Sequence, residues 1–206
     1  TRVASHELWW GAMAMDLGAF TPFFHAFRER ESINEIMEET CGARLTMNYM
    51  VPGGLMIDIH PDFCKKVKAF IKHFRVKIDE YDELLTGNVI FQNRMKGIGM
   101  LSKEDAISFG CSGPTARASG VSCDIRKLYP YEVYDKVNFE EIILTEGDSL
   151  ARYKVRLLEM KQSMNIIDQL IDNIPEGEIQ GKTKAVLKLP KGEFYSRVET
   201  ARGEFG

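Results

Sequence analysis

Residues 150–174 read LARYKVRLLEMKQSMNIIDQLIDNI and give the clearest indication of the fold. Apolar side chains recur through this stretch at alternating steps of three and four residues, for about three and a half heptads. This spacing predicts a long helix packed within a bundle, and Pro175 with Gly177 is expected to end it. The repeating positions are Leu150, Tyr153, Leu157, Met160, Met164, Ile167, Ile171 and Ile174.

Residues 8–27 form a second apolar stretch, whose length is that of a membrane span. A span is not expected, because Asp16 would be costly in lipid and Gly18 weakens a helix. Thr21 followed by Pro22 has the pattern of a helix start. We therefore expect two core helices, the second running from Pro22 to Cys41 and ending at a left-handed Gly42.

The remaining pattern completes a mainly α fold, a bundle of long helices with minor β elements. Apolar residues from Phe63 to Leu85 keep helical spacing and predict a helix of about six turns that closes at Gly87. Ser102 is expected to cap a short helix that ends at Gly110. The stretch 110–120 is expected to be a loop, and 185–189 and 194–198 to be short strands.

Composition excludes several classes of protein. The chain has 206 residues, 44% of them hydrophobic, which is enough for a sizeable core. Its net charge of −3 gives no excess of cations for binding nucleic acid. The four cysteines form no C-x-x-C pair and the histidines are scattered, so no metal site is predicted and a reducing compartment is expected. Both ends resemble cuts through a longer polypeptide, and residues 1–206 are expected to be one internal segment.

A few residues carry the chemical hypotheses. Asp16 lies in the apolar stretch, where burial would raise its pKa and make it a candidate for proton transfer. It could instead cap the turn at Gly18, or pair with Arg28 or Arg30. Two loops of small residues, at 113–120 and 199–204, each hold an arginine beside glycines and could form structural turns or let a ligand approach closely.

Many short motifs, in order along almost the whole chain, resemble one family. They are AMDLGA (14–19), TPFF (21–24), FRERE (27–31), TCGARL (40–45), PGG (52–54), GMLSKEDA (99–106), RASG (117–120), DIRK (124–127), PYEVYD (130–135) and ARGEFG (201–206). The sequence resembles the D subunit of bacterial NADH-quinone oxidoreductase, respiratory complex I, which is the 49 kDa subunit of mitochondria.

The resemblance implies a fold shared with the large subunit of nickel-iron hydrogenases, and residues 1–206 would be an internal part of that domain. It implies a protein that helps form the cavity where quinone is reduced, with proton translocation coupled to electron transfer from NADH. An iron-sulfur cluster in a neighbouring subunit would deliver the electrons, NAD would bind a distant subunit, and this segment would bind no cofactor or metal itself. Its partners would be other subunits of the peripheral and membrane arms, at the cytoplasmic side of the inner membrane, and alone it would be inactive.

The resemblance also assigns residues. Asp16 matches an aspartate that supports a quinone-site histidine, which belongs to an N-terminal region outside this segment, so Asp16 would tune the proton donor. Phe24, Arg202 and Gly203 would lie at the quinone cavity. Two alternatives stay open, namely the large subunit of an energy-converting hydrogenase and a non-catalytic assembly subunit.

Overall fold

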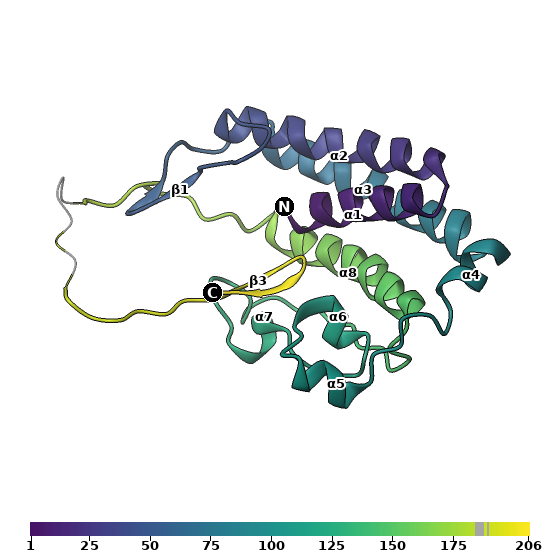
Figure 1. The fold of residues 1–206 in the computed structure, drawn as a ribbon. Helices are drawn as coiled ribbons and strands as arrows, with labels where there is room; N and C mark the ends of the chain where they lie inside the picture. Colours follow the sequence, from purple (N-terminus) through teal and green to yellow (C-terminus); the bar gives the residue numbers. More distant parts are fainter. Residues whose placement is uncertain (184–187, 189) are drawn as a thin grey trace.

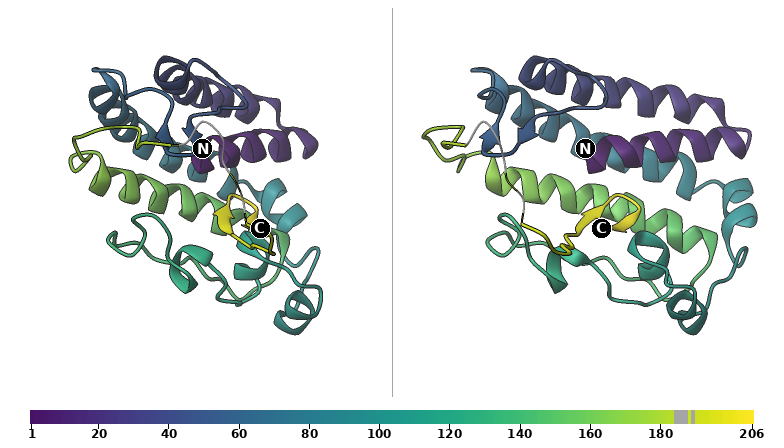
Figure 2. Two further views of the ribbon diagram at one scale, coloured as in Figure 1. Left: turned by 90° about the vertical axis from the view of Figure 1, so that its left-hand side faces the viewer. Right: turned by 60° about the vertical axis from the view of Figure 1, so that its left-hand side comes forward.

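The computed structural model describes residues 1–183, 188 and 190–206. The upper layer of the molecule consists of α1 (Arg2–Asp16), α2 (Phe20–Cys41) and α3 (Phe63–Tyr81). A short π-helix (Asp82–Thr86) extends α3. The long helix α8 (Ser149–Leu170) lies beneath this layer, as the views in Figures 1 and 2 agree. Four long helices therefore form the frame of the molecule.

Short elements form a lower layer on the other side of α8. They are α5 (Lys103–Ser108), α6 (Gly113–Arg117) and α7 (Ile125–Leu128). The short helix α4 (Val89–Met95) instead follows the π-helix at the end of the upper layer, and its Phe91 and Met95 belong to the main core. Two small antiparallel hairpins complete the part of the chain that the structure describes. One pairs β1 (Met50–Val51) with β2 (Gly54–Leu55), and the other pairs β3 (Val198–Thr200) with β4 (Gly203–Phe205), with Thr200 opposite Gly203.

Helix α8 is buried on two faces, which determines where its polar residues lie. One face carries Tyr153, Met160 and Met164 into the main core shared with α1–α3. The opposite side contributes Ala151 and Val155 to a second apolar cluster in the lower layer. Because both faces are covered, a charged residue on the flanks of α8 is removed from water and needs a partner.

The main helices lie where the sequence predicts them, although α8 ends at Leu170, before the predicted end at Ile174 and Pro175. Gly42 ends α2 in the left-handed conformation with φ of 76°, and the helix from Phe63 continues to Thr86 when its π-helical turn is included. Ser102 accepts a hydrogen bond from the amide of Asp105 and so caps α5. Helix α2 begins two residues before Pro22, which fits in the first turn because the amide groups there have no intrahelical acceptor.

Other expectations were wrong. The stretch 110–120 was expected to be a loop, but it contains α6, where Pro114 stands in the first turn and begins the helix. Of the strand expected at 194–198 only Val198 is in a strand, because pairing extends forward to Thr200. The strand expected at 185–189 falls almost wholly outside the described residues. Among the described helices none has the length and apolar character needed to cross a membrane.

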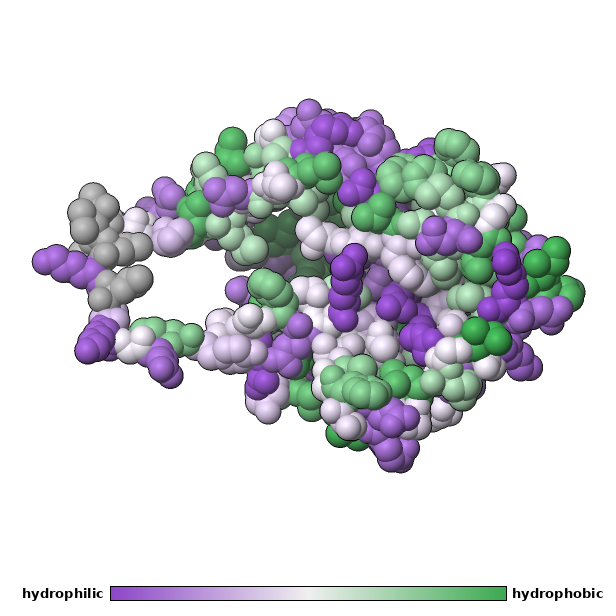
Figure 3. Space-filling view, in the orientation of Figure 1, coloured by the Kyte–Doolittle hydropathy of each residue, from purple (hydrophilic) through white to green (hydrophobic). Residues whose placement is uncertain are grey.

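The surface has one marked apolar hollow. A groove of about 300 Å³ opens between α2, α3 and the end of α8, and apolar side chains such as Ile36, Phe70 and Ile167 form most of its wall. Figure 3 shows a green recess beside the extended segment that follows α8. Elsewhere the visible face alternates polar and apolar side chains, with a strongly polar area over α2.

Candidate functional site

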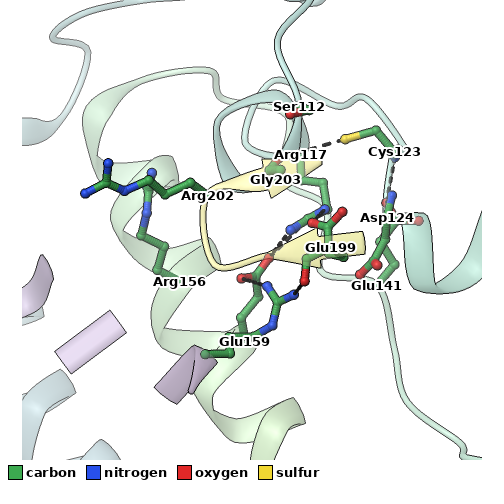
Figure 4. Close-up of polar contacts among 12 residues, drawn as sticks. Ser112, Arg117, Cys123, Asp124, Glu141, Arg156, Glu159, Glu199, Arg202 and Gly203 are labelled. Atoms are coloured by element: carbon green, nitrogen blue, oxygen red, sulfur yellow. Dashed lines mark hydrogen bonds and ion pairs between the residues drawn. The ribbon is translucent and has the colours of Figure 1, made fainter. Parts of the chain in front are cut away.

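Arg117 stands at the centre of a buried charge network. Helix α6 carries it into the space between α8 and the β3–β4 hairpin, where the residue is 0% exposed. Its Nη2 lies 2.5 Å from Oε1 of Glu159 on α8, and its Nη1 lies 2.9 Å from Oε1 of Glu199 on β3. Figure 4 shows the guanidinium lying between the two carboxylates. One arginine therefore connects three elements that are far apart in the sequence.

Glu159 is held as a carboxylate by several donors. Nε2 of His6 lies 2.9 Å from its Oε2, and Nη1 of Arg2 lies 3.6 Å from the same oxygen. Burial opposes the charge, but the hydrogen bond from His6 and the charge of Arg117 lower the pKa of Glu159 to about 2. Burial lowers the pKa of His6, so a neutral imidazole donates this hydrogen bond at neutral pH.

Glu199 fastens the hairpin to the rest of the molecule. Its Oε2 accepts a hydrogen bond of 3.2 Å from the amide of Ile125, and its carbonyl accepts one of 2.8 Å from Nη2 of Arg2. Its own amide donates to the hydroxyl of Tyr131 at 3.1 Å. Burial raises the pKa of Glu199 while the charge of Arg117 opposes that rise. Helices α1, α6 and α7 thus all hold one residue of β3.

The Arg202–Gly203 turn packs closely against the start of α6. Gly203 has φ of 128°, and a Cβ atom there would lie 2.4 Å from Oγ of Ser112. Gly113 has φ of 65°, and its Cβ would lie 2.4 Å from the carbonyl oxygen of Arg202. Both positions need glycine for conformation and for space. Oγ of Ser112 also accepts a hydrogen bond of 3.2 Å from the amide of Glu204, which fixes the turn.

Three arginines, Arg152, Arg156 and Arg202, form what we call the arginine face. None of them makes an ion pair with a carboxylate of the described residues. Burial and the charges of Arg152, Arg117 and Arg202 lower the pKa of Arg156 to about 10, against an opposing effect of Glu159. The side chains of Arg156 and Arg202 lie on the same side of the hairpin (Figure 4), and the guanidinium of Arg156 lies 4.8 Å from the ring centre of Trp9.

The site residues predicted from the sequence do not contact one another across the fold. Asp16 is exposed at the end of α1, so the expectation that this chain buries its carboxyl group was wrong, and neither Arg28 nor Arg30 pairs with it. It follows the last buried residue of α1, Ala14, and points away from the core. Phe24 is 68% exposed. Arg202 is exposed and Gly203 is buried, and within the described residues no hydrogen bond or ion pair joins these two to Asp16 or Phe24.

The described residues contain no cluster of side chains that could bind a metal ion. No three His, Cys, Asp or Glu side chains of the described residues are placed to hold an ion together. The four cysteines are free and partly buried. Burial raises the pKa of Cys123, whose thiol lies 3.9 Å from the carbonyl oxygen of Gly113.

Comparison with known proteins identifies the family. The model of the respiratory-chain NADH dehydrogenase 49 kDa subunit matches residues 16–203. The chain belongs to this 49 kDa subunit family.

Curated members of the 49 kDa subunit family extend beyond this sequence. The C/D subunit of the NADH-quinone oxidoreductase of Bacteroides thetaiotaomicron is 58% identical over 205 residues, which are 100% of this chain and 39% of the relative. The D subunit of the corresponding enzyme of Geobacillus kaustophilus is 47% identical over 206 residues, again 100% of this chain and 56% of the relative. The chain thus spans between about two fifths and somewhat over half of the length of these relatives.

A solved structure shares the fold of this 49 kDa family member almost completely. A chain in the membrane-bound sulfane sulfur reductase, an archaeal respiratory membrane complex, superposes with a TM-score of 0.95 at 35% sequence identity. The match covers 99% of this chain and 57% of that one. The arrangement of four long helices and a lower layer therefore occurs in a respiratory complex that is named for a different activity.

Sequence reasoning about this 49 kDa family member missed the centre of the network. Arg117 was noticed only as an arginine in a loop of small residues, and Glu159 and Glu199 were not considered. A signal for Glu159 was present, because it lies beside the apolar position Met160 on a helix that must be covered on both sides. Nothing local in the sequence distinguishes Glu199 from the exposed Glu204 five residues later.

Proposed function

We propose that this chain is part of an NADH:quinone oxidoreductase and helps enclose the site where quinone is reduced. The observation that carries the proposal is the family match over residues 16–203, together with relatives of up to 58% identity that are named NADH-quinone oxidoreductase subunits. In the proposed enzyme NADH is oxidised at a distant subunit, an iron-sulfur cluster of a neighbouring subunit passes the electrons on, and quinone takes them up. This segment binds neither of those groups.

The arginine face supports a location beside a redox group. Guanidinium groups stay charged at all physiological pH values, and Arg152, Arg156 and Arg202 have no carboxylate partner in the described part of the chain. Uncompensated positive charge stabilises the more negative, reduced form of a neighbouring acceptor. We place the Arg202–Gly203 turn at the edge of the quinone cavity, with Arg202 providing charge and Gly203 allowing close approach.

Asp16 acts, in this proposal, on a histidine that lies outside the segment. A carboxylate that accepts the N–H of an imidazole orients the ring and raises its basicity. Asp16 is free to do so because it points away from its own core at the end of α1. Phe24 is also exposed, one helical turn beyond Phe20, and would form an apolar wall of the same cavity. A neighbouring part of the assembled enzyme would cover both.

The wider setting follows from the same proposal. The partners are other subunits of the peripheral and membrane arms, the complex lies against the cytoplasmic side of the inner membrane, and quinone reduction is coupled to proton translocation. The segment alone is expected to be inactive, because the electron donor and the proton-donating histidine belong to other parts of the enzyme.

The test is Asp16→Asn in the complete enzyme. We expect quinone reduction by NADH to fall by at least tenfold, since an amide cannot balance the charge of a protonated imidazole. Reduction of a hydrophilic artificial acceptor should not change, which shows that electron entry is intact. Asp135→Asn, which alters an exposed carboxyl group of the lower layer, is the matched control. Full quinone turnover in an assembled Asp16→Asn enzyme would remove Asp16 from the mechanism.

A second candidate, reduction of sulfane sulfur, is favoured by the structural neighbour alone. Purified complex supplied with NADH and either a quinone or a polysulfide distinguishes the two by which acceptor is consumed. An energy-converting hydrogenase would instead require two C-x-x-C pairs in the rest of the polypeptide, to bind nickel and iron. A pure assembly role predicts that a photoreactive quinone analogue never labels this chain in the intact complex.

A further inference from the structure

The carboxyl group of Glu7 lies on the side of α1 that faces α2. His6 and Glu7 follow one another on α1, so their side chains project about 100° apart. His6 reaches Glu159 on α8, whereas Glu7 is directed toward the side where α2 carries Glu29 and Arg30, the two charged side chains of that helix that act on it most strongly. The two neighbouring residues therefore belong to separate buried polar groups.

The carboxyl group of Glu7 is completely removed from water. Its exposed fraction is 0%, and neither of its carboxyl oxygens has a hydrogen-bond partner among the described residues. A carboxylate without donors in an apolar interior is strongly unfavourable, and such a group keeps its proton instead. The geometry alone therefore indicates that Glu7 is a neutral acid.

Glu29 is buried too, but it is supplied with donors. It is 2% exposed, its Oε2 lies 2.6 Å from Nε2 of His73, and its Oε1 lies 2.5 Å from Nη2 of Arg28. Both of these partners reach the surface, with side chains 51% and 56% exposed. Glu29 is thus a buried carboxylate whose negative charge is stabilised from the edge of the bundle, next to a second acid that has no such support.

The other charged groups near Glu7 do not change the conclusion that Glu7 is a neutral acid. Burial and the charge of Glu29 raise the pKa of Glu7 to about 9, although the charge of Arg30 acts in the opposite direction. Nε of Arg30 has no partner of its own among the described residues. On α3, burial and the charges of Glu7 and Glu29 raise the pKa of Tyr81, so this residue adds no further charge near neutral pH.

We propose that Glu7 and Glu29 form a buried proton-binding pair, in which Glu7 carries one proton at neutral pH and the charge of Glu29 sets how tightly that proton is held. When the pair releases its proton, solvent accepts it and two negative charges are left inside the bundle. Anything that neutralises Glu29 from the surface therefore loosens the proton on Glu7.

The first experiment compares the full-length chain with its Glu7→Gln variant in urea unfolding at pH 5 to 9. The folded form keeps the proton up to about pH 9 while the unfolded chain releases it above about pH 4.5, so folding binds one proton in that interval and stability falls as pH rises. Relative to Glu7→Gln, the unfolding equilibrium constant of the wild type should rise by about tenfold for each pH unit. Glu35→Gln, which alters an exposed residue of α2, should follow the wild type. Parallel profiles for the wild type and Glu7→Gln would overturn the proposal.

A second measurement needs no variant to fold. The infrared spectrum of the wild-type chain at pH 7 should contain the carbonyl stretching band of a protonated carboxylic acid, at a pH where exposed carboxyl groups are ionised. The band should disappear when the sample is brought well above pH 9. A spectrum with carboxylate bands alone at pH 7 would show that Glu7 is ionised and would refute the assignment.

The role of Glu29 is tested separately with Glu29→Gln. Removing its charge should weaken proton binding, so the pH above which the carbonyl band of Glu7 disappears should move to a lower value. His73→Gln leaves the charge of Glu29 in place but removes a donor to it, and is expected to move that pH less. A midpoint for the band that is identical in the wild type and in Glu29→Gln would show that the two acids do not act as a pair.

Discussion

Replacing Arg117 by methionine is the most direct test of the buried charge network. The side chain is 0% exposed and is the shared cation of two carboxylates that are themselves 3% and 0% exposed. Methionine has a similar length but no charge, so Glu199 loses its only side-chain cation among the described residues, while Glu159 keeps His6 and Arg2. Removing one partner of a buried ion pair costs about 3–5 kcal/mol, chiefly because the other charge is left without compensation.

A second estimate from the structure has the same size. The pKa of Glu159 is about 2 in the folded chain against 4.5 for a free glutamate. By linkage, this difference corresponds to about 3 kcal/mol of folding free energy. The sign follows from the lowered pKa, because the contribution is present above pH 4.5 and is lost as the pH falls toward 2. Arg117 supplies part of it, and His6 and Arg2 supply the rest.

The assay is urea unfolding of the full-length chain, followed by circular dichroism at several pH values between 4 and 8. We expect Arg117→Met to lower the free energy of unfolding by about 3–5 kcal/mol at pH 7. The gap to the wild type should narrow toward pH 4, where the unpaired carboxylates take up protons. Lys161→Met, which breaks an exposed 2.6 Å pair between α8 and Asp79, should cost less than about 1 kcal/mol. A loss below about 1 kcal/mol for Arg117→Met, or a gap independent of pH, would refute the reasoning.

Two further substitutions test local features. Gly203→Ala would place a Cβ atom 2.4 Å from Oγ of Ser112 at a φ of 128°. We expect the free energy of unfolding, measured in urea, to fall by about 1–3 kcal/mol. The control is Gly177→Ala, which has a φ of 138° but nothing within 4 Å of its Cβ, so it should show only the conformational part of that loss. Ser102→Ala removes the cap of α5 and should cost about 1 kcal/mol; hydrogen exchange at the amide of Asp105 should become faster, and an unchanged rate would show that the cap contributes nothing.

The helices that were predicted correctly from the sequence follow from the periodic spacing of apolar residues. The long stretches at 63–85 and 150–174 carry apolar residues at helical spacing, and packing against other elements preserves the helices that this spacing predicts. Prediction failed where a tertiary contact decides the conformation. Helix α6 begins with Gly113, which sequence pattern assigns to a turn, but here glycine is present because the chain of Arg202 passes within contact distance.

The charge network could not be predicted for a related reason. Arg117 is separated from Glu159 by 42 positions and from Glu199 by 82, and no local pattern indicates which of the chain's 30 acidic residues will meet it. Asp16 shows the opposite error. An apolar neighbourhood in the sequence suggested burial, yet Asp16 is the last residue of α1, and the turn that follows it is itself at the surface.

The hydrogen bond between Arg2 and Glu199 joins residues 197 positions apart, and this has a consequence for biosynthesis. The ribosome adds the residues of the β3–β4 hairpin after those of every helix in the bundle. Arg117 and Glu159 are therefore synthesised before Glu199, the other carboxylate that Arg117 binds. Contacts of such long range are slow to form. In a nascent chain, the ion pair between Arg117 and Glu159 can therefore form before Glu199 and the turn at Arg202 pack against it.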